Sequence, residues 1–88
     1  MAMPFFVYIL YSSGHDRYYI GQTENPASRL ERHNEGYEFA TAPYVPWKLV
    51  CCIEKETRGE AMILERKLKN LNRLKLERFI AKYGVGNC

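Results

Sequence analysis

Aromatic and β-branched residues dominate two short stretches near the start of the chain. Residues 5–11 and residues 18–23 have this character, and residues 12–16 between them carry the Ser, Gly and Asp of a turn. The pattern predicts an antiparallel hairpin. Because side chains alternate between the two faces of a strand, Tyr8 and Tyr19 are expected to be near neighbours where the strand register allows it.

A helix is predicted to follow the hairpin, from Asn25-Pro26 to Gly36. Asn25 can accept hydrogen bonds from the free N–H groups of the first turn, and proline at the first helical position loses nothing by lacking its own N–H. Arg29 and His33 are four residues apart, so both lie on one helix face, directed back toward the end of the second strand.

The rest of the chain predicts a loop, a third strand and two further helices. Residues 37–46 contain two prolines and are expected to lack regular structure, whereas residues 47–53 have the apolar character of a strand. Thr57-Arg58-Gly59-Glu60 matches the capping box that begins a helix. Asn72 is expected to break that helix, and a last amphipathic helix to stop at Gly84.

Glu65 lies beside the apolar stripe of the first of these two helices, which is formed by Ala61, Leu64, Leu68 and Leu71. Its carboxylate is therefore expected at the margin of the core, where clefts form. Together the elements predict a single α+β domain over residues 1–84, followed by a short tail at residues 85–88.

Length and composition fit this single domain, since 88 residues with 47% hydrophobic content are enough for one small core. No apolar run approaches the roughly 18 residues that cross a bilayer, and the start of the chain lacks the pattern of a secretory signal. We therefore expect a soluble cytoplasmic protein without membrane contact. Cys51, Cys52 and Cys88 have neither metal-ligand spacing nor a disulfide framework, so all three are expected to be reduced.

The basic charge is concentrated in the C-terminal third. Residues 1–57 hold five Lys/Arg against seven Asp/Glu, whereas residues 58–88 hold eight against three. This skew is compatible with neutralising the phosphates of a nucleic acid. Solvated helix faces of ordinary proteins are often equally basic, so the charge alone leaves both interpretations open.

One set of residues has coherent chemistry, although each member alone is more often structural or solvated. A tyrosine pair is usually hairpin packing, and a tyrosine that acts as a base needs a nearby cation. The planar fork of Arg29 suits a phosphoryl group, and His33 can orient water near neutral pH. Glu65 is a hard oxygen ligand that suits Mg²⁺ or Mn²⁺.

These residues occur in an order that resembles the GIY-YIG nuclease superfamily, over nearly the whole chain. The matching segments are Phe6-Val7-Tyr8, Tyr19-Ile20-Gly21-Gln22-Thr23, Arg29 with His33, and Ala61 with Glu65. The chain resembles most the short single-domain bacterial type, which is similar to the N-terminal catalytic domain of the incision subunit of the ABC excinuclease. The resemblance implies a small three-stranded antiparallel sheet flanked by helices, which agrees with the predicted elements.

The resemblance also implies roles for the site residues. Tyr8 and Tyr19 would line the site, with Tyr8 helping to activate water. Arg29 would stabilise negative charge on the phosphoryl group, and His33 would assist through a hydrogen bond. Glu65 would bind a single divalent cation, Mg²⁺ or Mn²⁺, that polarises the scissile phosphate.

Two departures from the family pattern accompany the match. The first triplet lacks its glycine, although its tyrosine is kept, and Gly21 would still let the backbone lie close to the site. The family's nucleases often carry a further polar residue, commonly Asn, beyond the glutamate. Lys69, Asn70 and Asn72 are the nearby candidates, and none is assigned to that role.

The function that the resemblance implies is a divalent-metal-dependent endonuclease acting on DNA phosphodiester bonds, in repair or recombination. Relatives with known DNA targets usually carry a separate binding domain, so structure-selective cutting, or cutting directed by a protein partner, is expected. One alternative is a non-catalytic nucleic-acid-binding module of the same fold. The other is a protein-interaction domain whose tyrosines only pack in the hairpin. RNA as the substrate, and the oligomeric state, stay open.

Overall fold

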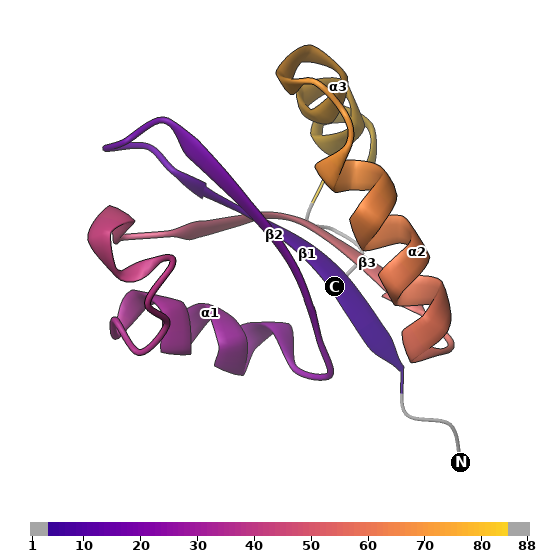
Figure 1. Cartoon of the computed structure of the whole chain (residues 1–88), viewed down its shortest axis with the longest axis horizontal. Helices are drawn as coiled ribbons and strands as arrows, with labels where there is room; N and C mark the ends of the chain where they lie inside the picture. The colour runs from indigo at the N-terminus through magenta and orange to yellow at the C-terminus, as the bar shows by residue number, and fades with distance from the viewer. Residues whose placement is uncertain (1–3, 85–88) are drawn as a thin grey trace.

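A computed structural model describes residues 4–84 and shows a three-stranded antiparallel sheet with helices on both faces (Figure 1). Helix α1 covers one face, and α2 and α3 cover the other. The predicted α+β fold and its three strands are thereby confirmed, while the predicted tail at 85–88 lies outside the described residues. The elements are β1 (Phe5–Ser12), β2 (Arg17–Thr23), α1 (Pro26–Asn34), β3 (Lys48–Lys55), α2 (Arg58–Lys69) and α3 (Arg73–Tyr83).

The strand order β2-β1-β3 places β1 at the centre of the sheet. On β2, Gly21 lies directly opposite Tyr8, and Tyr19 lies opposite Leu10. Tyr8 and Tyr19 are therefore diagonal neighbours on one face, as the alternation of side chains predicts. The pairing of β1 with β3 is also antiparallel, with one register shift between Ile9 and Leu10.

The central strand separates two different cores. Val7 and Ile9 point toward α2 and α3, where they pack with Ala61 and Leu68 in an aliphatic core. Tyr8 and Leu10 point toward α1, where they pack with Trp47 and the half-buried residues Tyr19, Leu30, Tyr44 and Leu49. Because β1 is buried on both faces, its alternation sets an apolar layer on one side and an aromatic layer on the other.

The helix starts follow the predicted caps. The side chain of Asn25 accepts a hydrogen bond from the backbone N–H of Ser28 at 3.1 Å, and Thr57 accepts one from Glu60 at 3.1 Å. Helix α2 ends at Lys69, and after a short break Asn72 caps the start of α3. Helix α1 ends at Asn34, two residues before the predicted stop at Gly36.

The loop between α1 and β3 is more ordered than its composition predicts. It contains one 3₁₀ turn, Ala42–Tyr44, and it is fixed to α1 through Asn34. The Trp47 N–H donates to Asn34 Oδ1 at 2.5 Å, and Asn34 Nδ2 donates to the Trp47 carbonyl at 3.0 Å. The Trp47 indole also donates to the carbonyl of Thr41 at 2.9 Å. These bonds hold the loop over the aromatic layer.

The cysteines divide into two states. Cys51 is a free, buried thiol, as expected. Cys52 is disulfide-bonded, so the expectation of a reduced thiol there was wrong, and Cys88 lies outside the described residues. Within residues 4–84, none of the helices has the length and apolar character that a membrane crossing requires.

Replacing Gly21 with alanine tests how tightly β2 lies against Tyr8. A Cβ at Gly21 would lie 2.5 Å from Tyr8 Oη and 2.7 Å from its Cζ, which forces the ring to move. We expect Gly21→Ala to lower the free energy of unfolding by about 1–3 kcal/mol, as overpacking does. Urea denaturation measures the change.

Gly14→Ala in the hairpin turn is the matched control, since a Cβ there meets nothing within 4 Å. Its free energy of unfolding should stay within about 0.5 kcal/mol of the parent protein. Equal stabilities for the Gly21 and Gly14 variants would contradict the close approach.

Candidate active site

A chain of buried hydrogen bonds joins Tyr8, His33 and Thr41. Tyr8 Oη lies 3.0 Å from His33 Nε2, and His33 Nδ1 lies 2.7 Å from Thr41 Oγ1. The Thr41 hydroxyl also lies 3.4 Å from the Glu38 carbonyl oxygen. In the tautomer that carries its proton on Nδ1, the imidazole donates to Thr41 Oγ1, and Nε2 accepts from the Tyr8 hydroxyl.

Burial keeps both partners of this bond neutral. Tyr8 is 2% exposed, and His33 and Thr41 are each 1% exposed. Desolvation raises the pKa of the Tyr8 phenol well above its ordinary value, the neighbouring Tyr19 adds to the rise, and Arg29 opposes it. Desolvation also lowers the pKa of His33. At neutral pH a protonated phenol therefore faces a neutral imidazole that can accept its proton.

Tyr19 completes the aromatic side of this cluster. Its ring centroid lies 5.0 Å from that of His33, in an edge-to-face arrangement, and 6.4 Å from that of Tyr8. Tyr19 is half-buried, so it is the more solvent-exposed of the two phenols. The predicted approach of Tyr8, Tyr19 and His33 to one another is thus what the fold produces.

Arg29 lies one turn before His33 on α1 and is held by an acidic residue from the loop. Its Nη1 is 3.6 Å from Glu38 Oε1, and Arg32 Nε reaches the same oxygen at 2.9 Å. The Arg29 side chain remains 39% exposed. Its charge acts on the pKa of both Tyr8 and His33, so it lies within the electrostatic field of the cluster.

Glu65 comes from α2, on the opposite face of the sheet. It lines a concavity of about 300 Å³ together with Gln22, Met62, Arg66, Lys69 and Asn70. The Glu65 side chain is 18% exposed, and its carboxylate pairs with the Lys69 ammonium at 2.7 Å. Its link to the tyrosines is electrostatic: it raises the pKa of Tyr8, by less than burial or Tyr19 does.

A second concavity, of about 420 Å³, adjoins the first at the edge strand. Its lining includes Arg29, and Gln22 lines both concavities, so this one residue lies between the Arg29 side and the Glu65 side. Four cationic side chains surround the two hollows: Arg29, Arg58, Arg66 and Lys69. The arrangement suits an anionic ligand that follows the edge of β2.

A divalent cation bound at Glu65 would have few protein ligands. Within the part of the chain that the structure describes, no group of three or more His, Cys, Asp or Glu could hold a metal. Magnesium commonly takes one or two carboxylates and fills the remaining positions with water and phosphate oxygens. The same concavity also contains Gln22, whose buried Oε1 accepts no hydrogen bond from any described residue. This oxygen-rich donor set fits Mg²⁺ or Mn²⁺.

The candidates for the family's further polar residue differ in their surroundings. Asn70 lines the Glu65 concavity, and Lys69 pairs with Glu65 itself. The Asn72 side chain instead accepts a hydrogen bond from the Lys75 N–H at 2.9 Å, as the cap of α3.

Sequence patterns did not reveal Thr41, Glu38 or Gln22 as neighbours of the site. Thr41 and Glu38 lie in a loop without periodicity, and their positions depend on bonds across the fold. Gln22 lies inside the tyrosine-containing strand segment, and alternation directs its side chain to the face opposite Tyr19. That alternation was the only available signal.

The pH dependence of stability tests the buried state of His33. Because its pKa lies below the ordinary 6.5, the unfolded chain takes up a proton at a higher pH than the folded chain does. Stability should therefore fall as pH drops below about 6.5. In His33→Gln this part of the decline should be lost, as thermal melts between pH 5 and 8 would show.

His15→Gln serves as the control, since it removes the chain's other histidine from the exposed hairpin turn. It should keep the decline of the parent protein below pH 6.5. A decline that vanished with His15 and persisted without His33 would contradict the assignment.

Comparison with known proteins places these features in a family. Residues 4–78 match the GIY-YIG catalytic domain. A structure-specific endonuclease subunit SLX1 homolog from Brugia malayi is 43% identical over 58 residues, covering 56% of this chain and 17% of that protein, so the chain corresponds to a small part of it. The solution structure of the UPF0213 protein BH0048 from Bacillus halodurans superposes with a TM-score of 0.62 at 30% identity, covering 93% of this chain and 87% of the other.

The family match spans most of the chain, and its range includes the two tyrosines, Arg29, His33 and Glu65. It agrees with the antiparallel sheet and with the motifs found in the sequence. The chain belongs to the GIY-YIG family.

Proposed function

We propose that this chain is a divalent-metal-dependent endonuclease domain that hydrolyses phosphodiester bonds in DNA. The observation that carries the proposal is the buried Tyr8–His33 donor–acceptor pair within the field of Arg29. The GIY-YIG domain match and the structure-specific endonuclease relative support a nuclease. The likeness to the excinuclease catalytic domain, inferred from the motifs, and a role in repair or recombination belong to the same proposal.

In the proposed reaction Tyr8 takes a proton from the attacking water while its own proton passes to His33. Thr41 holds the imidazole in the tautomer that leaves Nε2 free to accept. Burial keeps the Tyr8 phenol protonated in the resting protein at neutral pH by raising its pKa, so the transfer is tied to the approach of a substrate. Tyr19 lines the site and fixes the imidazole plane by its edge-to-face contact.

Arg29 stabilises the charge that develops on the phosphoryl oxygens, through the bidentate geometry of its guanidinium. Arg29 pairs with Glu38, lines the second concavity and remains partly exposed. Glu65 would hold the divalent cation, which supplies further stabilisation of negative charge on the phosphate and the leaving oxygen.

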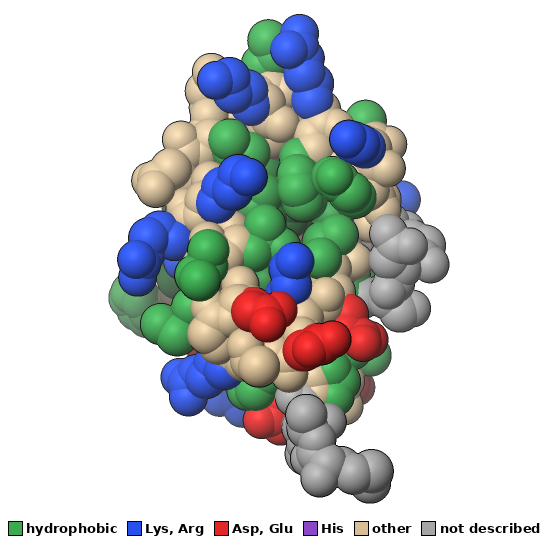
Figure 2. Space-filling view, turned by 90° about the vertical axis from the view of Figure 1, so that its right-hand side faces the viewer, with side chains coloured by type: hydrophobic (Ala, Val, Ile, Leu, Met, Phe, Trp, Pro, Cys, Tyr) green, Lys and Arg blue, Asp and Glu red, His purple; other side chains and the backbone are tan. Residues whose placement is uncertain are grey.

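The charge distribution supports DNA as the ligand. Figure 2, which views the side of α2 and α3, shows Lys and Arg side chains around an apolar centre. The groove between these helices is lined by Lys67, Lys75, Arg78 and Lys82 with Leu71, Phe79 and Tyr83. Phosphate contacts of this kind give binding that is weak, salt-dependent and little concerned with sequence.

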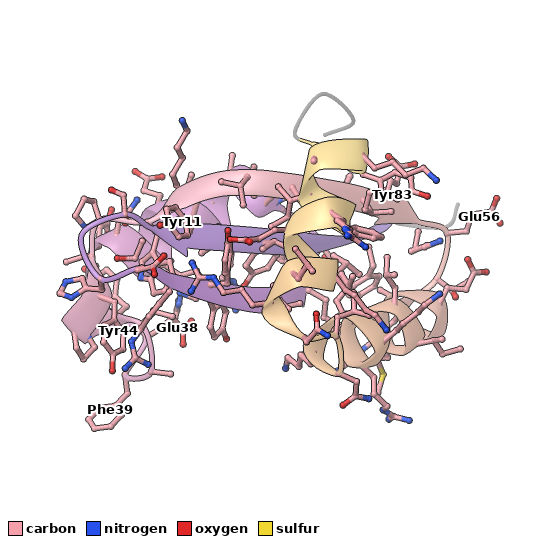
Figure 3. The ribbon with its side chains drawn as sticks, turned by 90° about the horizontal axis from the view of Figure 1, so that it is seen from above. Tyr11, Glu38, Phe39, Tyr44, Glu56 and Tyr83 are labelled. Carbon is pink, nitrogen blue, oxygen red and sulfur yellow. The ribbon has the colours of Figure 1, made fainter. Side chains whose placement is uncertain are left out.

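Phe39 supports a preference for unpaired or branched DNA. It follows Glu38 in the loop, is 97% exposed and projects away from the ribbon (Figure 3). Exposed aromatic rings stack on bases that have left the duplex, whatever their sequence. We propose structure-selective cutting, with a protein partner adding specificity.

A nicking assay with matched variants tests the catalytic roles. Purified protein is incubated with plasmid, branched and single-stranded DNA in Mg²⁺ or Mn²⁺. We expect Tyr8→Phe to lower the cleavage rate by about 10²–10⁴-fold, as the loss of general base catalysis does. Arg29→Ala should lower it by about 10²–10³-fold, and Glu65→Gln by at least as much.

Two controls separate these roles from general damage. Tyr11→Phe removes a hydroxyl that bonds Asp16 in the hairpin, and Glu60→Gln removes a carboxylate from the exposed start of α2. Both should cut DNA at the parent rate, and circular dichroism should show that every variant is folded. Cleavage that survives all three site substitutions, or DNA binding without cleavage in any metal, would overturn the enzymatic assignment.

Salt dependence tests whether the edge concavities contact phosphates. Arg58→Gln and Arg66→Gln each remove one cation from the lining of these hollows. Each should reduce the slope of log K against log [salt] by about one unit. Lys82→Gln, in the α2–α3 groove, is the comparison. If only Lys82→Gln changes the slope, DNA binds through that groove instead.

A further inference from the structure

Gln22 presents an unusual acceptor at the edge of the sheet. Its Oε1 is buried, yet no described residue donates a hydrogen bond to it. Buried polar atoms in folded proteins are nearly always paired, because an unpaired acceptor loses its hydration without replacement. An atom that departs from this rule calls for a role other than packing.

The position of Gln22 identifies what that role can be. On β2 its neighbour Gly21 faces Tyr8, so alternation turns the Gln22 side chain toward α2. There it shares the concavity of about 300 Å³ with Glu65, and it also lines the concavity that contains Arg29. Gln22 is therefore the residue at which the two hollows meet, and its amide oxygen is buried.

The donors around this oxygen leave it unpaired. Arg66 and Lys69 line the same concavity, but Lys69 pairs with Glu65, and no hydrogen bond joins either cation to Gln22 Oε1. A side-chain amide oxygen is a hard neutral ligand of the kind that Mg²⁺ and Mn²⁺ accept beside a carboxylate. Among the described residues that line this concavity, Glu65 supplies the only carboxylate.

We propose that Gln22 Oε1 and the Glu65 carboxylate together bind the divalent cation, as a two-oxygen ligand set contributed by β2 and α2. The inference rests on the proposed function and deepens it, since it assigns a second ligand from the other side of the concavity. It also explains why this buried acceptor has no donor among the described residues: its partner is a cation.

The direct test measures how tightly the whole chain binds Mn²⁺ without DNA. The electron paramagnetic resonance signal of free Mn²⁺ reports how much of the ion stays unbound. Gln22→Leu keeps the size of the side chain and removes the oxygen, so the Kd should rise by about tenfold. Gln22→Glu adds a charged ligand, so the Kd should fall by about tenfold. Glu60→Gln removes one negative charge from α2 outside the concavity and should leave the Kd within about twofold of the parent value.

A thermal melt gives a second readout that does not depend on cleavage. Without metal, Gln22→Leu should melt a few degrees above the parent protein, because a buried unpaired acceptor has been replaced by an apolar group. In saturating Mn²⁺ the parent protein should gain more than the variant, since the ligand stabilises only the form that binds it. A melt below that of the parent in the absence of metal would mean that Gln22 has a structural partner, and would overturn the proposal.

The outcomes distinguish this inference from the proposed function. If Gln22→Leu binds Mn²⁺ as tightly as the parent while Glu65→Gln does not, the Gln22 ligand is refuted and the nuclease proposal stands. If Glu65→Gln also binds Mn²⁺ unchanged, the metal site itself is refuted.

Discussion

The close approach of the Tyr8 ring to the backbone of Gly21 is the contact on which the rest of the site depends. Any side chain at Gly21 would occupy the position of the Tyr8 hydroxyl. With none there, the phenol extends over the edge strand and reaches His33 on α1. The helix cap at Asn25 then matters for chemistry as well as folding, because it sets where α1 begins and thus where His33 meets the phenol.

Burial keeps both members of the Tyr8–His33 pair uncharged. Desolvation moves the two pKa values apart, upward for the phenol and downward for the imidazole, so both groups are neutral and joined by one hydrogen bond. Transfer of the proton along this bond would create a phenolate and an imidazolium, which desolvation disfavours. Arg29 favours the phenolate and opposes the imidazolium, while Glu38 acts in the reverse sense. Desolvation is the largest influence on both pKa values, and Arg29 and Glu38 act on them in opposite senses.

The sequence predicted those features of the fold that depend on a few neighbouring residues. The hairpin, the caps at Asn25 and Thr57, and the break at Asn72 each follow from a few neighbouring residues, and the structure has all of them. The period of the α-helix, by which residues four apart share a face, likewise placed Arg29 and His33 on one face of α1. Thr41 and Glu38 could not be found in this way, because bonds between the loop and α1 fix their positions. The bonded state of Cys52 likewise depends on how the chain folds, which cysteine spacing does not reveal.

The edge position of β2 lets residues on opposite faces of one sheet line adjoining concavities, since Gln22 lines both. The tyrosines belong to the α1 face and Glu65 belongs to the α2 face, so a central strand between them would separate the two groups completely. Among the described strands, β2 pairs with β1 alone. Gly21 leaves the α1 face of β2 without a side chain, and Gln22 directs its amide toward the α2 face. Under the proposed function, a phosphate lying along this edge would meet Arg29 on one side and Glu65 on the other without crossing the sheet. The order β2-β1-β3, which leaves β2 at the edge of the sheet, is therefore what brings the two concavities together at Gln22.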